Sequence, residues 1–166
     1  MMSDLSYRFL NADDFADLHA MVSHWSVVRQ LGRWPWPPQE AFTRGRCKPY
    51  DGNGFIWAVC ENDRVIGTMA VTNGELGYMF APEVQGRGIA TNVAHDAITH
   101  AFAEHDWPVL KASVWEDNPP SAAVLRKCGF VHWQTHYTRS PTRLPTVVHQ
   151  YRLPRATWDR LRTTAQ

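Results

Sequence analysis

The pattern of hydrophobic and polar positions along the chain predicts short strands interleaved with helices. The clearest helix starts near Ile89, where apolar residues recur at i, i+4 and i+5 as far as Phe102, and it stops before Pro108. A second helix has well-marked ends, with Asn118 at its N-cap and Gly129 just past its last turn. The first pattern is typical of a helix that buries one face, and the second marks where a helix begins and ends.

Strands are predicted on both sides of these helices. Residues 55–61 and 65–72 form a hairpin pattern around a tight turn at 61–64, and residues 75–81 extend the antiparallel sheet. Residues 109–115 can lie parallel to the preceding strand because a helix connects the two. The other predicted elements are a strand at 6–10, a helix capped at 11–14 and ending near 23, a helix at 39–46, a strand pair at 130–138 and 146–153, and a C-terminal helix through Trp158 and Leu161.

The composition is that of an ordinary globular protein. At 166 residues, 44% of them hydrophobic and 20% charged, the chain fits a single domain, residues 1–166, that can bury a core without disulfides or metal. The formal net charge of +1 provides no long-range field for nucleic acid, so no such partner is expected. Six arginines near the C-terminus are interpreted as a solvated face: Arg139, Arg143, Arg152, Arg155, Arg160 and Arg162.

The cysteines and the N-terminus indicate a reducing compartment. Cys47, Cys60 and Cys128 are widely spaced, odd in number and form no C-x-x-C pair, so neither a disulfide framework nor a metal site is expected. The first twenty residues lack the apolar core of a signal peptide, and the longest apolar run, residues 55–60, is too short to cross a bilayer. We therefore expect a cytoplasmic protein without a membrane partner.

Residues 85–90, Gln-Gly-Arg-Gly-Ile-Ala, form a candidate anion site between a predicted strand and a predicted helix. The first turn of a helix leaves backbone amides without partners, and the helix dipole adds positive charge there. Gly86 and Gly88 remove side chains that would hold a phosphate away from the backbone. A dinucleotide-binding fold is the rival interpretation, but the third glycine is missing and antiparallel hairpins come first.

Three stretches together resemble the GCN5-related N-acetyltransferases, the GNAT family. The pattern Gln-x-x-Gly-x-Ala at 85–90 resembles the acetyl-CoA pyrophosphate loop of that family, and residues 118–130 resemble its Asn-x-x-Ser-x-x-Val-Leu-x-Lys-x-Gly-Phe helix. Residues 27–31 with Trp-Pro-Trp-Pro at 34–37, and the ending at 151–158, are similar to the Rim-type subfamily. That subfamily is named for enzymes that acetylate the N-terminal residue of ribosomal proteins.

The resemblance implies a single-domain α/β (α+β) GNAT fold, with a mixed, mostly antiparallel sheet that splays between its fourth and fifth strands and has helices on both faces. Acetyl-CoA is then expected in the splay, with its pyrophosphate on the loop amides and its pantetheine arm along the fourth strand. Asn118 is expected to bond the pantetheine, to cap its own helix, or both. The implied cofactor-binding residues are Tyr78, Met79, Phe80, Gln85, Gly86, Arg87, Gly88, Ile89, Ala90, Thr91, Asn118 and Lys127.

Two side chains are candidates for catalysis. Glu75 begins the strand that leads to the cofactor, so its carboxylate can take a proton from an amine through one water, or it is simply a solvated strand-end residue. Many relatives carry a tyrosine after the leucine of the second motif to protonate the leaving thiolate, and this chain has Arg126 there. Ser121 matches a serine that Rim-type members place near the sulfur and is the candidate donor; an ordinary helix hydroxyl is the alternative.

The segment 24–49 contains the candidate acceptor surface. Trp34 and Trp36 lie in a proline-constrained loop that either lines an amine site or covers the core. We expect direct transfer to a primary amine, with a protein or peptide N-terminus preferred over an amino sugar or polyamine. A nonenzymatic acyl-CoA-binding module is a third alternative, which needs the glycine loop but neither Glu75 nor Ser121. Self-association as a homodimer is left open.

Overall fold

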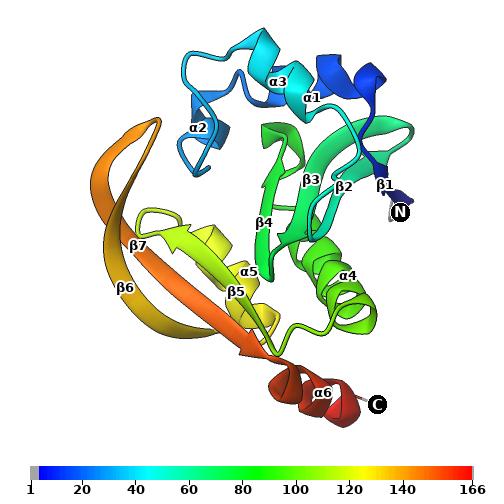
Figure 1. The fold of residues 1–166 in the computed structure, drawn as a ribbon, viewed down its shortest axis with the longest axis vertical. Helices are drawn as coiled ribbons and strands as arrows, with labels where there is room; N and C mark the ends of the chain where they lie inside the picture. The colour runs from blue at the N-terminus through cyan, green and yellow to red at the C-terminus, as the bar shows by residue number, and fades with distance from the viewer. Residues whose placement is uncertain (1–3, 166) are drawn as a thin grey trace.

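The computed structural model describes residues 4–165, and these residues contain a seven-stranded sheet. The strand order is β1-β2-β3-β4-β5-β7-β6, and all neighbours are antiparallel except β4 and β5 (Figure 1). The predicted mixed, mostly antiparallel sheet is confirmed. The strands are β1 (Leu5–Phe9), β2 (Gly54–Glu61), β3 (Arg64–Thr72), β4 (Glu75–Phe80), β5 (Val109–Trp115), β6 (Val131–Ser140) and β7 (Arg143–Pro154).

Strands β4 and β5 separate almost as soon as they begin. One register pair joins them, Glu75 with Lys111, next to a hydrogen bond of 2.9 Å from the Lys111 amide to the Gly74 carbonyl. Beyond this point β5 pairs along its whole length with β7, while β4 stays paired with β3. The splay expected between the fourth and fifth strands is therefore present.

Helices cover both faces of the sheet. On one face the His100 ring of α4 (Ile89–Glu104) contacts the rings of Phe55 and Trp57, at centroid distances of 4.8 and 5.2 Å. Side chains alternate along a strand, so Ile56 points to the opposite face. There it shares a cavity wall with Leu18 of α1 (Phe15–Met21).

The predicted helices are present, with differences at their ends. Helix α1 ends at Met21, shortly before the expected end near residue 23, and a short helix α2 follows that the sequence pattern does not predict. Four prolines and three tryptophans between residues 24 and 49 obscure any helical period there. The other helical elements are α2 (Trp25–Val28), α3 (Glu40–Arg46), α5 (Pro119–Lys127), α6 (Arg155–Thr164), η1 (Ala12–Asp14) and η2 (Pro82–Val84).

The turns follow their expected chemistry. Asn62 and Asp63 join β2 to β3 with φ values of 51° and 65°, as a tight hairpin turn with two left-handed residues requires. The last hairpin is longer than predicted, because β6 and β7 continue to Ser140 and from Arg143. Within residues 4–165, no helix has both the length and the apolar character needed to cross a membrane.

The interpretation of the C-terminal arginines as a solvated face is wrong for Arg155. Its guanidinium donates to the carbonyls of Phe102, at 2.5 Å, and Trp107, at 3.2 Å, and stacks 4.8 Å from the Phe102 ring centroid. These carbonyls lie near the end of α4, where cations are favoured. Arg155 therefore attaches α6 to the α4–β5 connection.

The junction between β1 and α1 depends on a buried carboxylate. Asp14 accepts hydrogen bonds from both terminal nitrogens of Arg8, at 2.9 and 2.7 Å, and from the Asn11 amide at 2.8 Å. The Arg8 hydrogen bonds, opposed by burial, hold the pKa of Asp14 below its usual range. The carboxylate thus stabilises the folded chain in its ionised form.

Asp14→Asn should lower the free energy of unfolding by about 1.5–3 kcal/mol at about pH 7, because charge-assisted hydrogen bonds are lost. A depressed pKa stabilises the fold above the unfolded value of about 3.9, and this contribution disappears as the pH falls through the folded pKa. In urea denaturation the deficit should therefore shrink below about pH 4. The exposed Asp13→Asn is the control, and a deficit independent of pH would contradict the assignment.

Candidate active site

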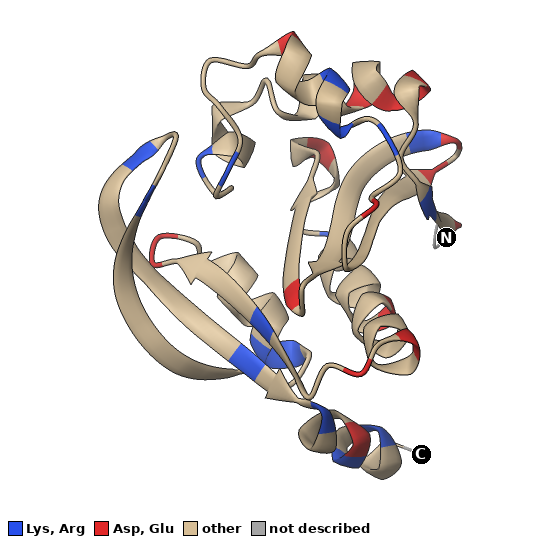
Figure 2. Ribbon diagram, in the orientation of Figure 1, with Lys and Arg blue, Asp and Glu red and all other residues tan. Residues whose placement is uncertain are grey.

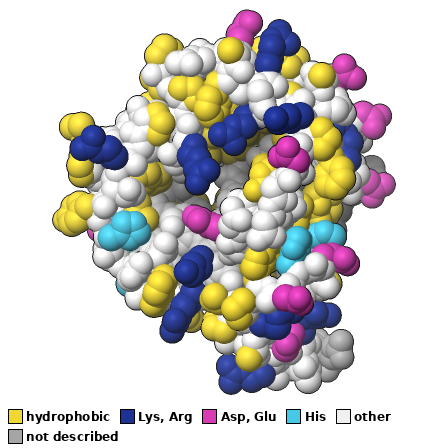
Figure 3. Space-filling view, viewed as in Figure 1, with side chains coloured by type: hydrophobic (Ala, Val, Ile, Leu, Met, Phe, Trp, Pro, Cys, Tyr) yellow, Lys and Arg dark blue, Asp and Glu magenta, His cyan; other side chains and the backbone are white. Residues whose placement is uncertain are grey.

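A cavity of about 520 Å³ opens at the splay. Its walls come from β4, β5, the start of α5, the segment between α2 and α3, and β6 near its tip. In the space-filling view a hollow lies near the centre of the molecule, between the end formed by α1–α3 and the β6–β7 hairpin (Figure 3). Segments far apart in the sequence therefore share one site.

The cavity reaches both faces of β4. Glu75 and Gly77 are paired with Thr72 and Ala70 of β3, on the face that α1 covers, whereas Tyr78 points to the opposite face. All five residues line the cavity, because β5 has left the edge of β4. A Cβ atom at Gly77 would meet no atom within 4 Å, so the strand surface beside Glu75 is open.

On the α5 side, the Tyr78 and Ser121 hydroxyls lie 2.7 Å apart. Burial raises the pKa of Tyr78 to about 12, and the Ser121 hydrogen bond opposes this rise only in part. Tyr78 is therefore a neutral phenol at neutral pH. The Asn118 side chain accepts from the Ser121 amide at 3.4 Å, so it caps α5 while also lining the cavity.

The glycine loop has the backbone that the sequence suggests. Gly86 and Gly88 have φ values of +81° and +77°, a backbone conformation that residues other than glycine rarely adopt. A Cβ at either position would meet open space within 4 Å. The glycines therefore provide both the conformation of the turn and room beside it.

Three backbone amides at the start of α4 precede its first intrahelical hydrogen bond. That bond runs from the Asn92 amide to the Gly88 carbonyl at 3.2 Å, so the amides of Ile89, Ala90 and Thr91 have no intrahelical acceptor. This is the arrangement that binds phosphate at helix N-termini.

Several predicted cofactor residues lie outside the cavity wall. Phe80 is the last residue of β4, which at six residues is about 20 Å long, and the loop 85–91 lies beyond that end of the strand. The Gln85 side chain donates to the Phe80 carbonyl at 3.1 Å and so shapes the loop. Arg87 forms an ion pair with Glu61 at 2.8 Å, and Lys127 is exposed at the end of α5.

The two tryptophans of the candidate acceptor surface lie in different surroundings. Trp34 lines the cavity and packs against Phe42 with ring centroids 5.1 Å apart. Trp36 is not among the lining residues and packs against Trp25 instead, at 5.2 Å. Trp34 also packs against the hydrophobic core, whereas Trp36 is 39% exposed and its neighbour Trp25 is 44% exposed. The role of either tryptophan in binding an acceptor stays a prediction.

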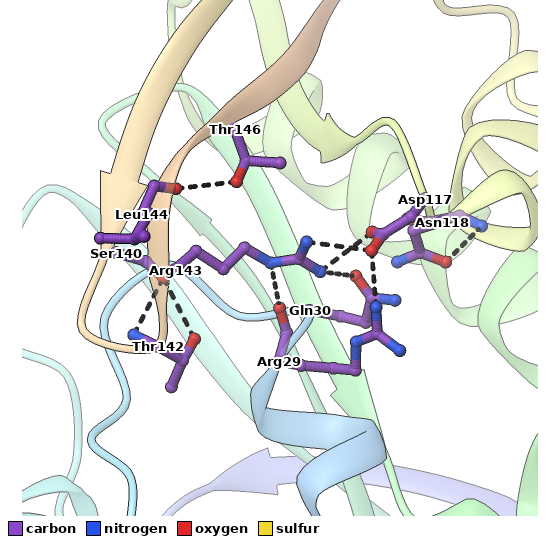
Figure 4. A network of polar contacts seen from close by, with 10 residues as sticks. Arg29, Gln30, Asp117, Asn118, Ser140, Thr142, Arg143, Leu144 and Thr146 are labelled. Atoms are coloured by element: carbon purple, nitrogen blue, oxygen red, sulfur yellow. Dashed lines mark hydrogen bonds and ion pairs between the residues drawn. The ribbon is translucent and has the colours of Figure 1, made fainter.

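A polar network joins Arg143 of the β6–β7 hairpin to the end of α2 and to Asp117, which precedes α5 (Figure 4). The Arg143 guanidinium donates to both carboxylate oxygens of Asp117, at 3.0 and 2.9 Å, to the Arg29 carbonyl at 2.7 Å and to the Gln30 side chain at 2.9 Å. Hydrogen bonds from Arg143, and then the charges of Arg143 and Arg29, lower the pKa of Asp117. For Arg143 too, the solvated-face interpretation is wrong.

All three cysteines are free, buried and poorly suited to nucleophilic chemistry. Burial raises the pKa of Cys47, Cys60 and Cys128, the last to about 11. The Cys128 thiol contacts the Thr91 carbonyl at 3.9 Å and links α5 to α4.

The family model for the acetyltransferase (GNAT) domain matches residues 4–131, which is more than half of the chain and includes the glycine loop, β4 and α5. The protein belongs to the GNAT acetyltransferases. A comparison with curated protein sequences gave no match.

Solved structures with low sequence identity share the fold of this GNAT protein. A spermidine N-acetyltransferase SpeG chimera from Vibrio cholerae and human SSAT is 17% identical with a TM-score of 0.77, covering 94% of this chain and 98% of that one. The RimL ribosomal L7/L12 α-N-protein acetyltransferase in complex with coenzyme A is 19% identical with a TM-score of 0.75, covering 93% and 95%. The AAC(6')-Ib structure with ribostamycin and coenzyme A is 15% identical with a TM-score of 0.77, covering 96% and 98%.

Two features of this GNAT site are not predicted by the sequence. The Tyr78 hydroxyl meets Ser121 on a helix 43 residues away, and no local pattern signals that pairing. Arg139, interpreted as solvated, lines the cavity together with Arg33 and Arg46. Each of these arginines is unremarkable in its own segment, because only the folded chain brings them together.

Proposed function

We propose that this protein transfers an acetyl group from acetyl-CoA directly to a primary amine, with a protein or peptide N-terminus as the preferred acceptor. The observation that carries the proposal is a cavity that passes through the splay. It presents the Glu75 carboxylate on one face of β4 and the Tyr78–Ser121 pair on the other. A base and a proton donor on opposite sides of a cofactor channel suit acyl transfer to an amine. We also propose a single domain spanning residues 1–166 and a cytoplasmic location.

The residues at the splay fit acetyl-CoA. Among the described residues, β5 offers no register partner to Tyr78, Met79 or Phe80, so the backbone edge of β4 can pair with the amides of a pantetheine arm. At the far end of that edge, the open glycine turn and the three free amides of α4 suit a pyrophosphate. The RimL and AAC(6')-Ib structures, which have the same fold, contain coenzyme A.

When bound, acetyl-CoA supplies a thioester acetyl group. Glu75, on the acceptor face, takes the proton that the amine must lose, because an α-amino group with a pKa of about 7.7–8.0 is mostly protonated at neutral pH and an alkyl amine with a pKa of about 10.4 almost fully so. A positioned general base contributes ~10²–10⁴ in rate. The open strand surface at Gly77 leaves room for the amine beside Glu75.

The Tyr78–Ser121 pair returns a proton to the leaving sulfur. Either hydroxyl can donate in this hydrogen bond. We propose that Tyr78 donates and Ser121 accepts, so that the Ser121 proton is available to the cavity that both residues line. The raised pKa of Tyr78 keeps this phenol protonated at neutral pH. This pair takes the role that a tyrosine at the position of Arg126 has in many relatives.

Direct transfer agrees with the state of the cysteines. A covalent acyl-cysteine route needs an accessible thiolate, and thiolates form where charge or a helix N-terminus lowers the pKa. Here burial raises the pKa of all three thiols. We therefore favour attack by the amine itself.

Two alternatives remain open. Relatives with the same fold act on small amines, as the names of the spermidine acetyltransferase and its chimera indicate, so a small amine is the second acceptor class. A nonenzymatic acyl-CoA-binding module would need the loop alone. Acetyl-CoA-dependent thiol release, measured against N-terminal peptides and small amines, separates the three.

Gly88→Glu should abolish binding of acetyl-CoA, because it adds a negative charge at the proposed pyrophosphate site. At ~100 times the dissociation constant, acetyl-CoA should stabilise the wild type by ~2.7 kcal/mol, roughly 5–10 °C in melting temperature. Gly88→Asn is the matched control, since asparagine tolerates the left-handed backbone without added charge. A full thermal shift in Gly88→Glu would show that the loop assignment is wrong.

Glu75→Gln should lower kcat by about 10-fold or more and flatten its rise with pH, while the acetyl-CoA thermal shift stays at the wild-type value. Glutamine keeps the size of the side chain and removes the base. Initial rates of thiol release over a range of pH measure the effect. An unchanged pH–rate profile would remove Glu75 from the mechanism.

Ser121→Ala should reduce kcat by a few-fold to ~10²-fold with little change in acetyl-CoA affinity, because a thiolate with a pKa of about 8.5 leaves readily. Tyr78→Phe should have a smaller effect of the same kind. The double variant should resemble Ser121→Ala, since Tyr78 acts through Ser121. Fully additive losses in kcat would contradict a shared proton path.

A further inference from the structure

The acceptor side of the cavity carries an excess of positive charge. Arg33 follows α2, Arg46 ends α3 and Arg139 lies near the tip of β6, and all three line the cavity. Glu75 is the one carboxylate among the lining residues, all of which lie in the described chain. The ribbon view shows basic segments near the tip of the β6–β7 hairpin and in the part of the chain that contains α2 and α3 (Figure 2), and basic side chains gather around the hollow in the space-filling view (Figure 3).

These arginines have no acidic partner. Within residues 4–165 none of the three forms an ion pair; the Arg46 guanidinium lies 4.8 Å from the Phe42 ring centroid and 6.0 Å from that of Trp34. Nearby, Arg29 and Arg143 are both paired with Asp117. The excess is local, because the whole chain has 17 basic and 16 acidic residues.

The arginines lie away from the proposed pyrophosphate site. The glycine loop 85–91 follows the far end of β4 and is not part of the cavity wall. Arg33 lies in the segment that connects α2 and α3, and Arg46 is the last residue of α3; these elements belong to the end of the molecule formed by α1–α3 (Figure 1). The charge is therefore directed at the acceptor and not at the phosphates of coenzyme A.

A cleft lined by charge of one sign concentrates ligands of the opposite sign. The guanidinium fork also matches the two oxygens of a carboxylate or phosphate. The same charges repel a polycation, and they favour the free base of an approaching amine because like charge lowers the pKa of an ammonium group.

We propose that the acceptor is an amine that carries a carboxylate or phosphate group, which Arg33, Arg46 and Arg139 bind while the amine faces Glu75. This inference rests on the proposed function and specifies its substrate. The anionic group belongs either to an acidic residue close to a peptide N-terminus or to a small anionic amine. Polyamines and aminoglycosides are disfavoured.

Matched acceptor pairs test the proposal in the thiol-release assay with the full-length protein. Peptides that begin Ser-Glu-Glu are compared with Ser-Gln-Gln, and phosphoethanolamine is compared with ethanolamine, with spermidine as the cationic arm. The anionic member of at least one pair should have a kcat/KM at least about 10-fold higher, and added salt should reduce this advantage. The pair that shows the effect identifies a peptide or a small-molecule acceptor. Equal or better turnover of the neutral members or of spermidine overturns the proposal and leaves the acetyltransferase function intact.

Substitutions of the arginines test whether these side chains cause the preference for anionic acceptors. Arg33→Gln and Arg139→Gln should each raise KM for the anionic acceptor by about 3- to 30-fold, with KM for acetyl-CoA and for the neutral acceptor unchanged, and Arg33→Lys should retain part of the affinity. Arg162→Gln, on exposed α6, is the control and should have no effect. Equal changes for anionic and neutral acceptors would contradict the assignment.

A binding measurement separates failure of the anion site from failure of the proposed acetyltransferase function. With coenzyme A present, the anionic member of a pair should raise the melting temperature more than the neutral member, whether or not turnover occurs. A preference for the anion without thiol release from any amine would sustain the anion site and contradict the acetyltransferase function. Thiol release without any preference for the anionic member would support the acetyltransferase function and contradict the anion site.

Discussion

The separation of β4 from β5 is the constraint on which the rest of the structure depends. Strand β5 is held along its length by β7, β4 is held by β3, and the two meet only at Glu75 and Lys111. A sheet that divides in this way leaves a backbone edge without a partner, and such edges pair readily with other chains or ligands. In this protein the edge lines a cavity that is open to both faces of β4.

Side-chain contacts connect the two parts of the divided sheet away from the point where the strands separate. Arg143 connects the β6–β7 hairpin to α2 and to Asp117, and it also stacks 4.6 Å from the Trp115 ring centroid. Its side chain is 10% exposed, whereas that of Asp117 is 41% exposed, so solvent weakens the charge attraction and the geometry of several hydrogen bonds matters more. The network holds the β6–β7 hairpin against the end of α2 and includes Gln30, which lines the cavity.

The distribution of charge matters more here than its sum. A chain with a net charge of +1 exerts little long-range attraction, yet Arg33, Arg46 and Arg139 converge on one cavity without acidic partners. All three side chains are exposed, so their field acts at the solvent-accessible side of the cavity and is weakened by salt. The net charge therefore says nothing about selectivity at the site.

The sequence predicts elements whose signals are local. The caps of α5, the left-handed turn at Asn62 and Asp63 and the glycine loop before α4 each depend on backbone preferences within a few residues. The segment 24–49 is the exception, because tryptophans and prolines placed by tertiary packing conceal the short helix α2. The ends of β6 and β7 are also missed, since their pairing continues beyond the apolar pattern.

The sequence by itself determined the family motifs, the order of strands and helices, and the candidate roles of Glu75 and Ser121. Only the tertiary structure decided that Tyr78 meets Ser121, that Trp34 and not Trp36 lines the cavity, and that Arg143 and Arg155 are structural. The physical reason is distance along the chain. Backbone conformation depends on neighbouring residues, whereas a cavity wall depends on side chains from segments that only packing and strand register bring together.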